Sequence, residues 1–97
     1  MVNRLEKIAI DNRLELLPGW ITRKGGLALS KSFEFSDFVS AFAFMTKVAL
    51  VSEKMGHHPE WFNVYNRVDV TLTTHDCGGV SDKDFELAVR IENISKT

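Results

Sequence analysis

The three histidines of this chain all lie within residues 53–84, and they are the side chains best suited to chemistry. His57 and His58 are adjacent in the run E-K-M-G-H-H-P-E-W-F-N-V-Y, and His75 follows in T-L-T-T-H-D-C-G-G-V-S-D. Because imidazole titrates near neutral pH, two such rings on either side of a substrate can donate one proton and remove another. The clustering therefore predicts acid and base catalysis by histidine.

Other interpretations of these side chains are simpler. A single exposed histidine is most often an ordinary surface residue, and Glu53 could be part of a solvated helix face. Three histidines could also bind zinc, but the adjacent pair His57 and His58 lacks the one-face spacing of a helical metal site. We therefore expect no metal. Cys77 has no neighbouring base that would make it a nucleophile.

Composition limits the class of protein. A chain of 97 residues with 44% apolar content fits a single domain covering residues 1–97. Twelve basic and thirteen acidic residues give a net charge of -1, so the sequence shows no excess of positive charge for binding nucleic acid or an anionic membrane. One cysteine and the lack of a signal-type or membrane-spanning apolar run favour a cytoplasmic location.

The first half of the chain predicts a helix, a hairpin and a second helix. Apolar residues at near-helical spacing predict a helix over residues 5–17, ended by the Pro-Gly pair that follows. Alternating side chains predict strands over 20–24 and 27–35, with Gly25-Gly26 as the turn. Ser36 can cap the next helix, assisted by the charge of Asp37, and this helix should be the most buried one. Gly56 should end it, just before the histidine pair.

The second half predicts another hairpin and a final helix. Residues 61–65 and 68–74 alternate as strands, with Asn66-Arg67 as the turn, and Ser81 with Asp84 forms a capping box for the last helix. The order helix-strand-strand-helix-strand-strand-helix indicates an α+β fold, a four-stranded antiparallel sheet with helices packed on one face. This fold could bring His75, at the end of the last strand, into one pocket with His57.

The expected sheet also has open edges. Unpaired backbone groups at a sheet edge are a liability that small proteins often resolve by pairing edges across a dimer. We therefore expect a homo-oligomer, either a homodimer or a homotetramer.

The spacing of the site residues resembles the signature of the pterin-4a-carbinolamine dehydratases. Intervals of five, nine and eight residues separate the histidine-proline run, the tyrosine, the third histidine and the last aspartate. The resemblance extends to Pro18-Gly19-Trp20 and the Phe33-x-Phe35 strand, whereas Gly56 departs from the aspartate common in relatives. The signature positions are Glu53, His57, His58, Pro59, Tyr65, His75 and Asp84.

The resemblance implies a reaction and roles for these residues. Members dehydrate 4a-hydroxytetrahydropterin to quinonoid dihydropterin and water in the recycling of tetrahydrobiopterin-type cofactors, and they need no metal or organic cofactor. It implies that His57 and His75 transfer protons, in an order left open, while His58 mainly holds the pterin. Glu53 and Asp84 would orient imidazoles. The implied substrate-binding set is Gly56, His57, His58, Pro59, Trp61, Thr73, Thr74, His75 and Asp76.

A second function remains open from the same resemblance. Animal relatives double as the dimerisation cofactor of a homeodomain transcription factor, and some relatives act only as assembly factors. The chain could therefore be a non-catalytic binding or dimerisation module. Relatives of the second kind tend to lose signature histidines, and this chain keeps all three. The natural pterin and the presence of a partner hydroxylase are left undetermined.

Overall fold

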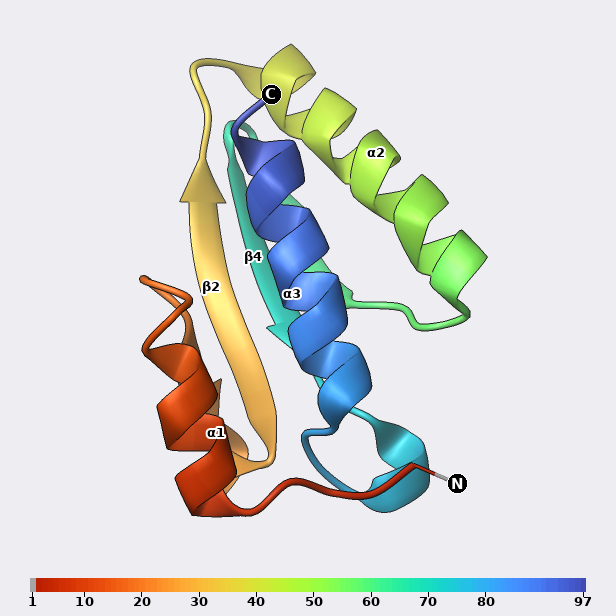
Figure 1. Ribbon diagram of the computed structural model, residues 1–97. Helices are drawn as coiled ribbons and strands as arrows, with labels where there is room; N and C mark the ends of the chain where they lie inside the picture. The colour runs from red at the N-terminus through yellow and green to blue at the C-terminus, as the bar shows by residue number, and fades with distance from the viewer. Residues whose placement is uncertain (1) are drawn as a thin grey trace.

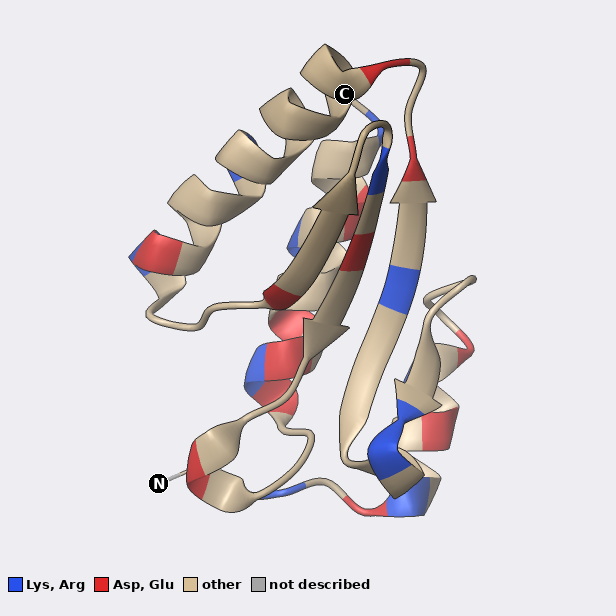
Figure 2. Cartoon of the chain, turned by 180° about the vertical axis from the view of Figure 1, so that it is seen from behind, with Lys and Arg blue, Asp and Glu red and all other residues tan. Residues whose placement is uncertain are grey.

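The computed structural model describes residues 2–97, which form one four-stranded antiparallel sheet with helices on one face (Figure 1). The predicted α+β order is confirmed, with a short 3-10 turn added inside each half of the chain. The opposite face of the sheet is left uncovered (Figure 2). The elements are α1 (Lys7–Leu14), β1 (Ile21–Arg23), η1 (Lys24–Gly26), β2 (Ala28–Glu34), α2 (Phe38–Met55), β3 (Glu60–Val64), β4 (Arg67–Leu72), η2 (His75–Cys77) and α3 (Asp82–Ser95).

The strands follow the order β1-β2-β4-β3, so β2 and β4 form the centre of the sheet. Their antiparallel register runs from Leu29 opposite Leu72 to Glu34 opposite Arg67. β1 pairs only with β2, and β3 pairs only with β4. The last strand of the chain is therefore internal, and β3 is an edge whose outer backbone groups have no strand partner within the sheet.

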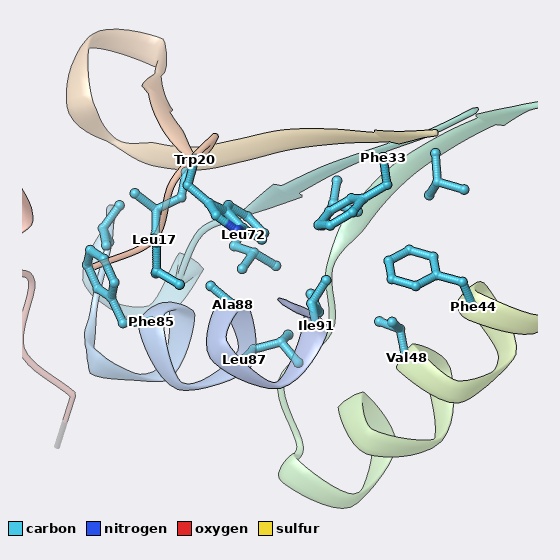
Figure 3. Packing of buried hydrophobic residues seen from close by; sticks show 14 of the residues in the cluster. Leu17, Trp20, Phe33, Phe44, Val48, Leu72, Phe85, Leu87, Ala88 and Ile91 are labelled. Carbon is cyan, nitrogen blue, oxygen red and sulfur yellow. The ribbon is translucent and has the colours of Figure 1, made fainter. Parts of the chain in front are cut away.

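The core lies between the sheet and its helices. Alternate side chains of β2 and β4 point toward α3, because successive residues of a strand face opposite sides of a sheet. Leu72 from the sheet and Leu87 and Ile91 from α3 belong to one buried apolar cluster (Figure 3). All three are completely buried. This packing fixes α3 across the centre of the sheet.

One charged side chain interrupts the apolar face of β2. Lys31 lies on the helix-facing side of the strand, where its ammonium group pairs with the carboxylate of Glu92 on α3 and donates to the carbonyl of Pro18 at 3.1 Å. The indole nitrogen of Trp20 donates to the same carboxylate at 2.8 Å. This network ties the turn after α1 to α3.

Several predicted boundaries were wrong. α1 is shorter than residues 5–17, ending at Leu14 before the chain turns. The turn between β3 and β4 is formed by Tyr65 and Asn66 instead of Asn66-Arg67, and Tyr65 adopts a positive φ of 48°. The amide of Asn63 supports this turn by donating to the carbonyls of Tyr65 and Arg67 at 3.2 and 2.8 Å.

The ends of α2 depend on two local contacts. Its N-cap is Asp37, not Ser36, because the Asp37 carboxylate accepts the backbone amide of Ser40 at 2.8 Å. Gly56 ends the helix in the left-handed conformation with φ of 66°, as predicted, since glycine enters that region without a Cβ clash.

The prediction that α2 is the most buried helix was wrong. Only one stripe of it faces the core, whereas Val39 and Leu50 are 74% and 68% exposed. α3 carries the larger buried face. An apolar sequence does not say whether a second layer covers a helix, and no part of residues 2–97 covers the outer side of α2. Within residues 2–97, no helix combines the length and apolar character needed to cross a membrane.

Candidate active site

A buried imidazole and carboxylate pair forms the centre of the site. His57 follows the left-handed Gly56, and its backbone amide bonds to the carbonyl of Ser52 at 3.1 Å. This turn directs the ring toward α3, where Nε2 lies 2.6 Å from Oδ1 of Asp84. Asp84 is fully buried and His57 is 9% exposed. Because a buried carboxylate without a partner is costly, the pair is a fixed part of the fold.

Asp84 also belongs to the cap of α3. Its Oδ2 atom accepts the backbone amide of Ser81 at 2.9 Å, and this contact completes the predicted capping box. The hydroxyl of Thr74 donates to the same oxygen at 2.7 Å. The two carboxylate oxygens therefore divide their contacts, one toward the imidazole and one toward the helix cap.

His58 points away from its neighbour. Its Nε2 atom lies 2.8 Å from Oε1 of Glu53, and both side chains are well exposed. The residue before Pro59 is restricted to extended geometry, which turns successive side chains in different directions. The adjacent histidines therefore present one buried ring and one surface ring.

His75 lies in η2, one residue after Thr74, and its side chain is 84% exposed. The closest charged group is Glu60, whose Oε2 atom is 3.7 Å from Nε2, while its other oxygen is 3.7 Å from the ammonium of Lys24. The bond from Thr74 to Asp84 holds the segment of His75 beside the segment of His57. However, the single chain does not enclose the His75 ring as we expected, because the strand ends at Leu72 and the 3-10 turn directs the ring outward.

The two described cavities lie elsewhere. One, of about 770 Å³, lies between the start of the chain and the β1–η1 segment, and includes Arg4, Ile10 and Arg23 in its lining. The other, of about 280 Å³, lies between the start of α2 and the end of α3. Neither is lined by a residue of the predicted site. Within residues 2–97, no three His, Cys, Asp or Glu side chains are grouped so that they could hold a metal ion.

The remaining predicted site residues differ in how free their polar groups are. Thr74 uses its amide in a bond to the carbonyl of Gly79 at 2.8 Å, and its side chain is buried. The hydroxyl of Thr73 donates to the carbonyl of Leu27 at 2.8 Å. Trp61 is half-buried against the core. Gly56 and Asp76 are exposed, and Pro59 is half-buried.

Two contacts were missed by the sequence analysis. Thr74 was expected to contact substrate through its backbone and no role was given to its side chain, but its hydroxyl faces inward to Asp84 and Ser81. Glu60 was not singled out, although it is the charged group closest to His75. No local pattern signals the first contact. The second follows from the strand register, which places Glu60 opposite Thr71 near the end of β4.

Comparison with known proteins identifies the family of this arrangement. The family described as Pterin 4 alpha carbinolamine dehydratase matches residues 3–94. The chain belongs to the pterin-4a-carbinolamine dehydratase family. A relative from Rhizobium johnstonii, provisionally named pterin-4-alpha-carbinolamine dehydratase, is 54% identical over 94% of this chain and 90% of its own length. A relative of the same provisional name from Burkholderia multivorans is 50% identical over 98% of this chain and 93% of its own length.

Solved structures of pterin dehydratases share the fold. A crystal structure described as a transcriptional coactivator/pterin dehydratase from Brucella melitensis superimposes with a TM-score of 0.93 at 47% identity, covering 96% of this chain and 99% of that one. A pterin dehydratase-like protein identified as a RuBisCO assembly factor in the alpha-carboxysome gives a TM-score of 0.71 at 23% identity, covering 84% and 94%. The second likeness shows the fold alone. The resemblance drawn from the sequence is therefore confirmed at the level of family and fold.

Proposed function

We propose that this chain dehydrates 4a-hydroxytetrahydropterin to quinonoid dihydropterin and water, with His57 and His75 transferring protons. Family membership and the complete histidine signature support this proposal. The observation that carries it is the buried contact of 2.6 Å between Nε2 of His57 and Oδ1 of Asp84. A carboxylate in this position orients an imidazole, as a proton-transfer residue requires.

The proposed reaction needs only proton transfer. The bond between C4a and its hydroxyl oxygen breaks, and the hydroxyl takes up a proton and leaves as water. The proton on N5 is removed, and its bonding electrons form the double bond between N5 and C4a. No electron is gained or lost overall, so two imidazoles that donate and accept protons supply what the step needs. In this proposal His58, whose Nε2 atom contacts Glu53 at the surface, binds the pterin.

A rate measurement tests this proposal. Carbinolamine is generated chemically, and formation of quinonoid dihydropterin is followed with and without the protein. We expect the wild type to exceed the uncatalysed rate, and His57→Ala and His75→Ala each to lower kcat by about 100-fold or more, the usual worth of one acid or base. Lys7→Ala, which removes an exposed ion pair far along the chain from the histidines, serves as control. A wild-type rate equal to the uncatalysed rate would end the proposal.

We also propose that the chain associates with copies of itself, as a homodimer or homotetramer. The outer edge of β3 has no strand partner among the residues that the structure describes, and α2 exposes the large apolar side chains of Val39, Phe42 and Leu50. Exposed apolar patches of this kind mark interaction surfaces.

A non-catalytic binding role is the second candidate function. It is favoured by the same uncovered surfaces and by the similar structure described as a transcriptional coactivator/pterin dehydratase from Brucella melitensis. The test is purification of the chain from its host with all three histidines replaced. An unrelated protein that still co-purifies stoichiometrically with this triple variant would support the binding role. A wild-type chain that purifies as a homo-oligomer without other components and with full dehydratase activity would leave the role without support.

A further inference from the structure

The hydrogen bonds that link His57, Asp84, Thr74 and Ser81 allow one assignment of donors and acceptors. That assignment gives the His57 ring a defined role. We infer that neutral His57 carries its proton on Nε2 and accepts a proton through Nδ1, and that Thr74 and Ser81 are positioning residues which fix this state. The catalytic part of the inference rests on the proposed dehydratase activity. The tautomer itself can be measured without a substrate.

The assignment of donors and acceptors starts from the Asp84 carboxylate, which receives several hydrogen bonds. The backbone amide of Ser81 and the hydroxyl of Thr74 both donate to Oδ2, at 2.9 and 2.7 Å. An ionised carboxylate has no proton to give, so it accepts at both of its oxygens. Its other oxygen, Oδ1, faces the imidazole of His57.

The donor in the contact between the Thr74 and Ser81 hydroxyls can then be assigned. Thr74 has one hydroxyl proton, which it uses on Asp84, so in the 2.7 Å contact between Thr74 and Ser81 the donor must be Ser81. The oxygen of Ser81 remains free to accept the backbone amide of Lys83 at 3.2 Å, as a helix cap requires. Every buried polar group of the network is then satisfied, which is the condition for such a network to be rigid.

The same reasoning fixes the ring. At 2.6 Å from an accepting oxygen, Nε2 of His57 must carry a proton, because two acceptors at that distance would repel. Nδ1 has no hydrogen-bond partner within residues 2–97. It is also not fully buried, because Ser52 Oγ is the single fully buried side-chain nitrogen or oxygen without a partner in that range. Nδ1 therefore reaches the surface with a free lone pair.

This state makes neutral His57 the base of the proposed reaction. Nδ1 takes the proton from N5 of the pterin. In the imidazolium that results, Nε2 keeps its own proton and still donates it in the hydrogen bond to Asp84. Protonation of the leaving hydroxyl then falls to His75, whose exposed ring can exchange protons with water. The structure thus separates the two histidines, one anchored through a buried carboxylate and one open to solvent.

Nitrogen NMR of the imidazole rings tests the tautomer. In protein labelled with ¹⁵N at histidine, long-range proton-nitrogen correlations at a pH where His57 is neutral show which nitrogen carries the proton, and His57→Gln assigns the resonances. We expect the Nε2-protonated form to be the main species. A wild-type ring that is mainly protonated on Nδ1 would overturn the inference without any variant.

Two substitutions at one position test the positioning role. Thr74→Val keeps the shape of the side chain and removes the hydroxyl, so we expect a mixture of tautomers and a kcat about tenfold lower at similar KM, as for other groups that orient a catalytic imidazole. Thr74→Ser restores the hydroxyl and should restore both. If the wild type and Thr74→Val have equal tautomer content and equal kcat, the positioning role of Thr74 is overturned. If the tautomer shifts as expected and no variant or wild type is active, the dehydratase proposal fails and the tautomer assignment stands.

Discussion

Asp84 shows how one residue can combine a structural contact with a chemical one. As the third residue of α3 it completes a capping box, and the same carboxylate reaches His57, 27 positions earlier in the chain. Each task uses a different oxygen, so neither contact displaces the other. The stability of α3 and the orientation of the imidazole are therefore coupled at this residue.

Asp84→Asn should lower both stability and activity. The amide can keep some of the geometry but removes the negative charge that faces the imidazole, so we expect a free energy of unfolding about 1–3 kcal/mol lower. We expect kcat about 100-fold lower. Urea unfolding and carbinolamine dehydration measure the two effects. The control is Asp82→Asn in the same helix turn, where the carboxylate is exposed and pairs with Arg13. It should change stability by less than about 1 kcal/mol, and an equal effect of both variants would contradict the assignment.

Ser52 has a buried hydroxyl with no hydrogen-bond partner among residues 2–97, and it lies in the last turn of α2, before His57. Ser52→Ala removes this unsatisfied group and improves helix propensity, so we expect the free energy of unfolding to rise by about 1 kcal/mol. The urea midpoint checks it. Thr46→Ala on the same helix, where the exposed hydroxyl bonds only to the Phe42 carbonyl, separates the propensity gain from the burial effect. A loss of stability in Ser52→Ala would show that the hydroxyl has a partner, such as a buried water.

At the scale of the element, α2 begins with a charged cap. The Asp37 carboxylate accepts the backbone amide and the side chain of Ser40, and these contacts hold the pKa of Asp37 below its ordinary value of 3.8. Because the pKa is lower in the folded chain, the ionised cap stabilises α2 above that ordinary value. The contribution is lost as the pH falls through the folded pKa.

Asp37→Ala should therefore lower the melting temperature at neutral pH, and the difference from the wild type should shrink as the pH is lowered below 3.8. Calorimetry or circular dichroism at several pH values measures this. Glu86→Ala, an exposed acidic residue inside α3, is the matched control and should show no such convergence. A difference that stays constant with pH would mean that the charge of Asp37 does not contribute.

At the scale of the whole molecule, the sheet is covered on one side and the outer side of α2 carries apolar groups without a layer above them (Figures 1 and 2). Self-association would remove this apolar surface from water, at a gain of roughly 25 cal/mol per Å² buried. The proposed homo-oligomer follows from this balance.

Phe42→Glu combined with Leu50→Glu should convert the oligomer to a smaller species, because each change places a charge in the apolar surface of α2. Light scattering coupled to size-exclusion chromatography measures the mass. Val89→Glu changes a half-exposed apolar residue on α3 and should leave the mass unchanged. If the α2 variant keeps the wild-type mass, that face of α2 is not the interface, and the edge of β3 becomes the surface to test.

The sequence by itself determined the element order and which strand side chains face the core. The alternation in 27–35, the stop at Gly56 and the capping box at Ser81 are local effects, since each depends on backbone geometry or on residues a few positions apart. The histidine signature was equally visible, because spacing along a chain needs no coordinates.

Only the tertiary structure decided the partners of those residues. Strand order placed β4 inside the sheet, packing left α2 partly uncovered, and η2 turned His75 into solvent. It also brought the hydroxyl of Thr74 to the carboxylate that holds His57. These outcomes depend on how the helices pack against the sheet. That packing, and not local propensity, determines which residues far apart in the chain become hydrogen-bond partners.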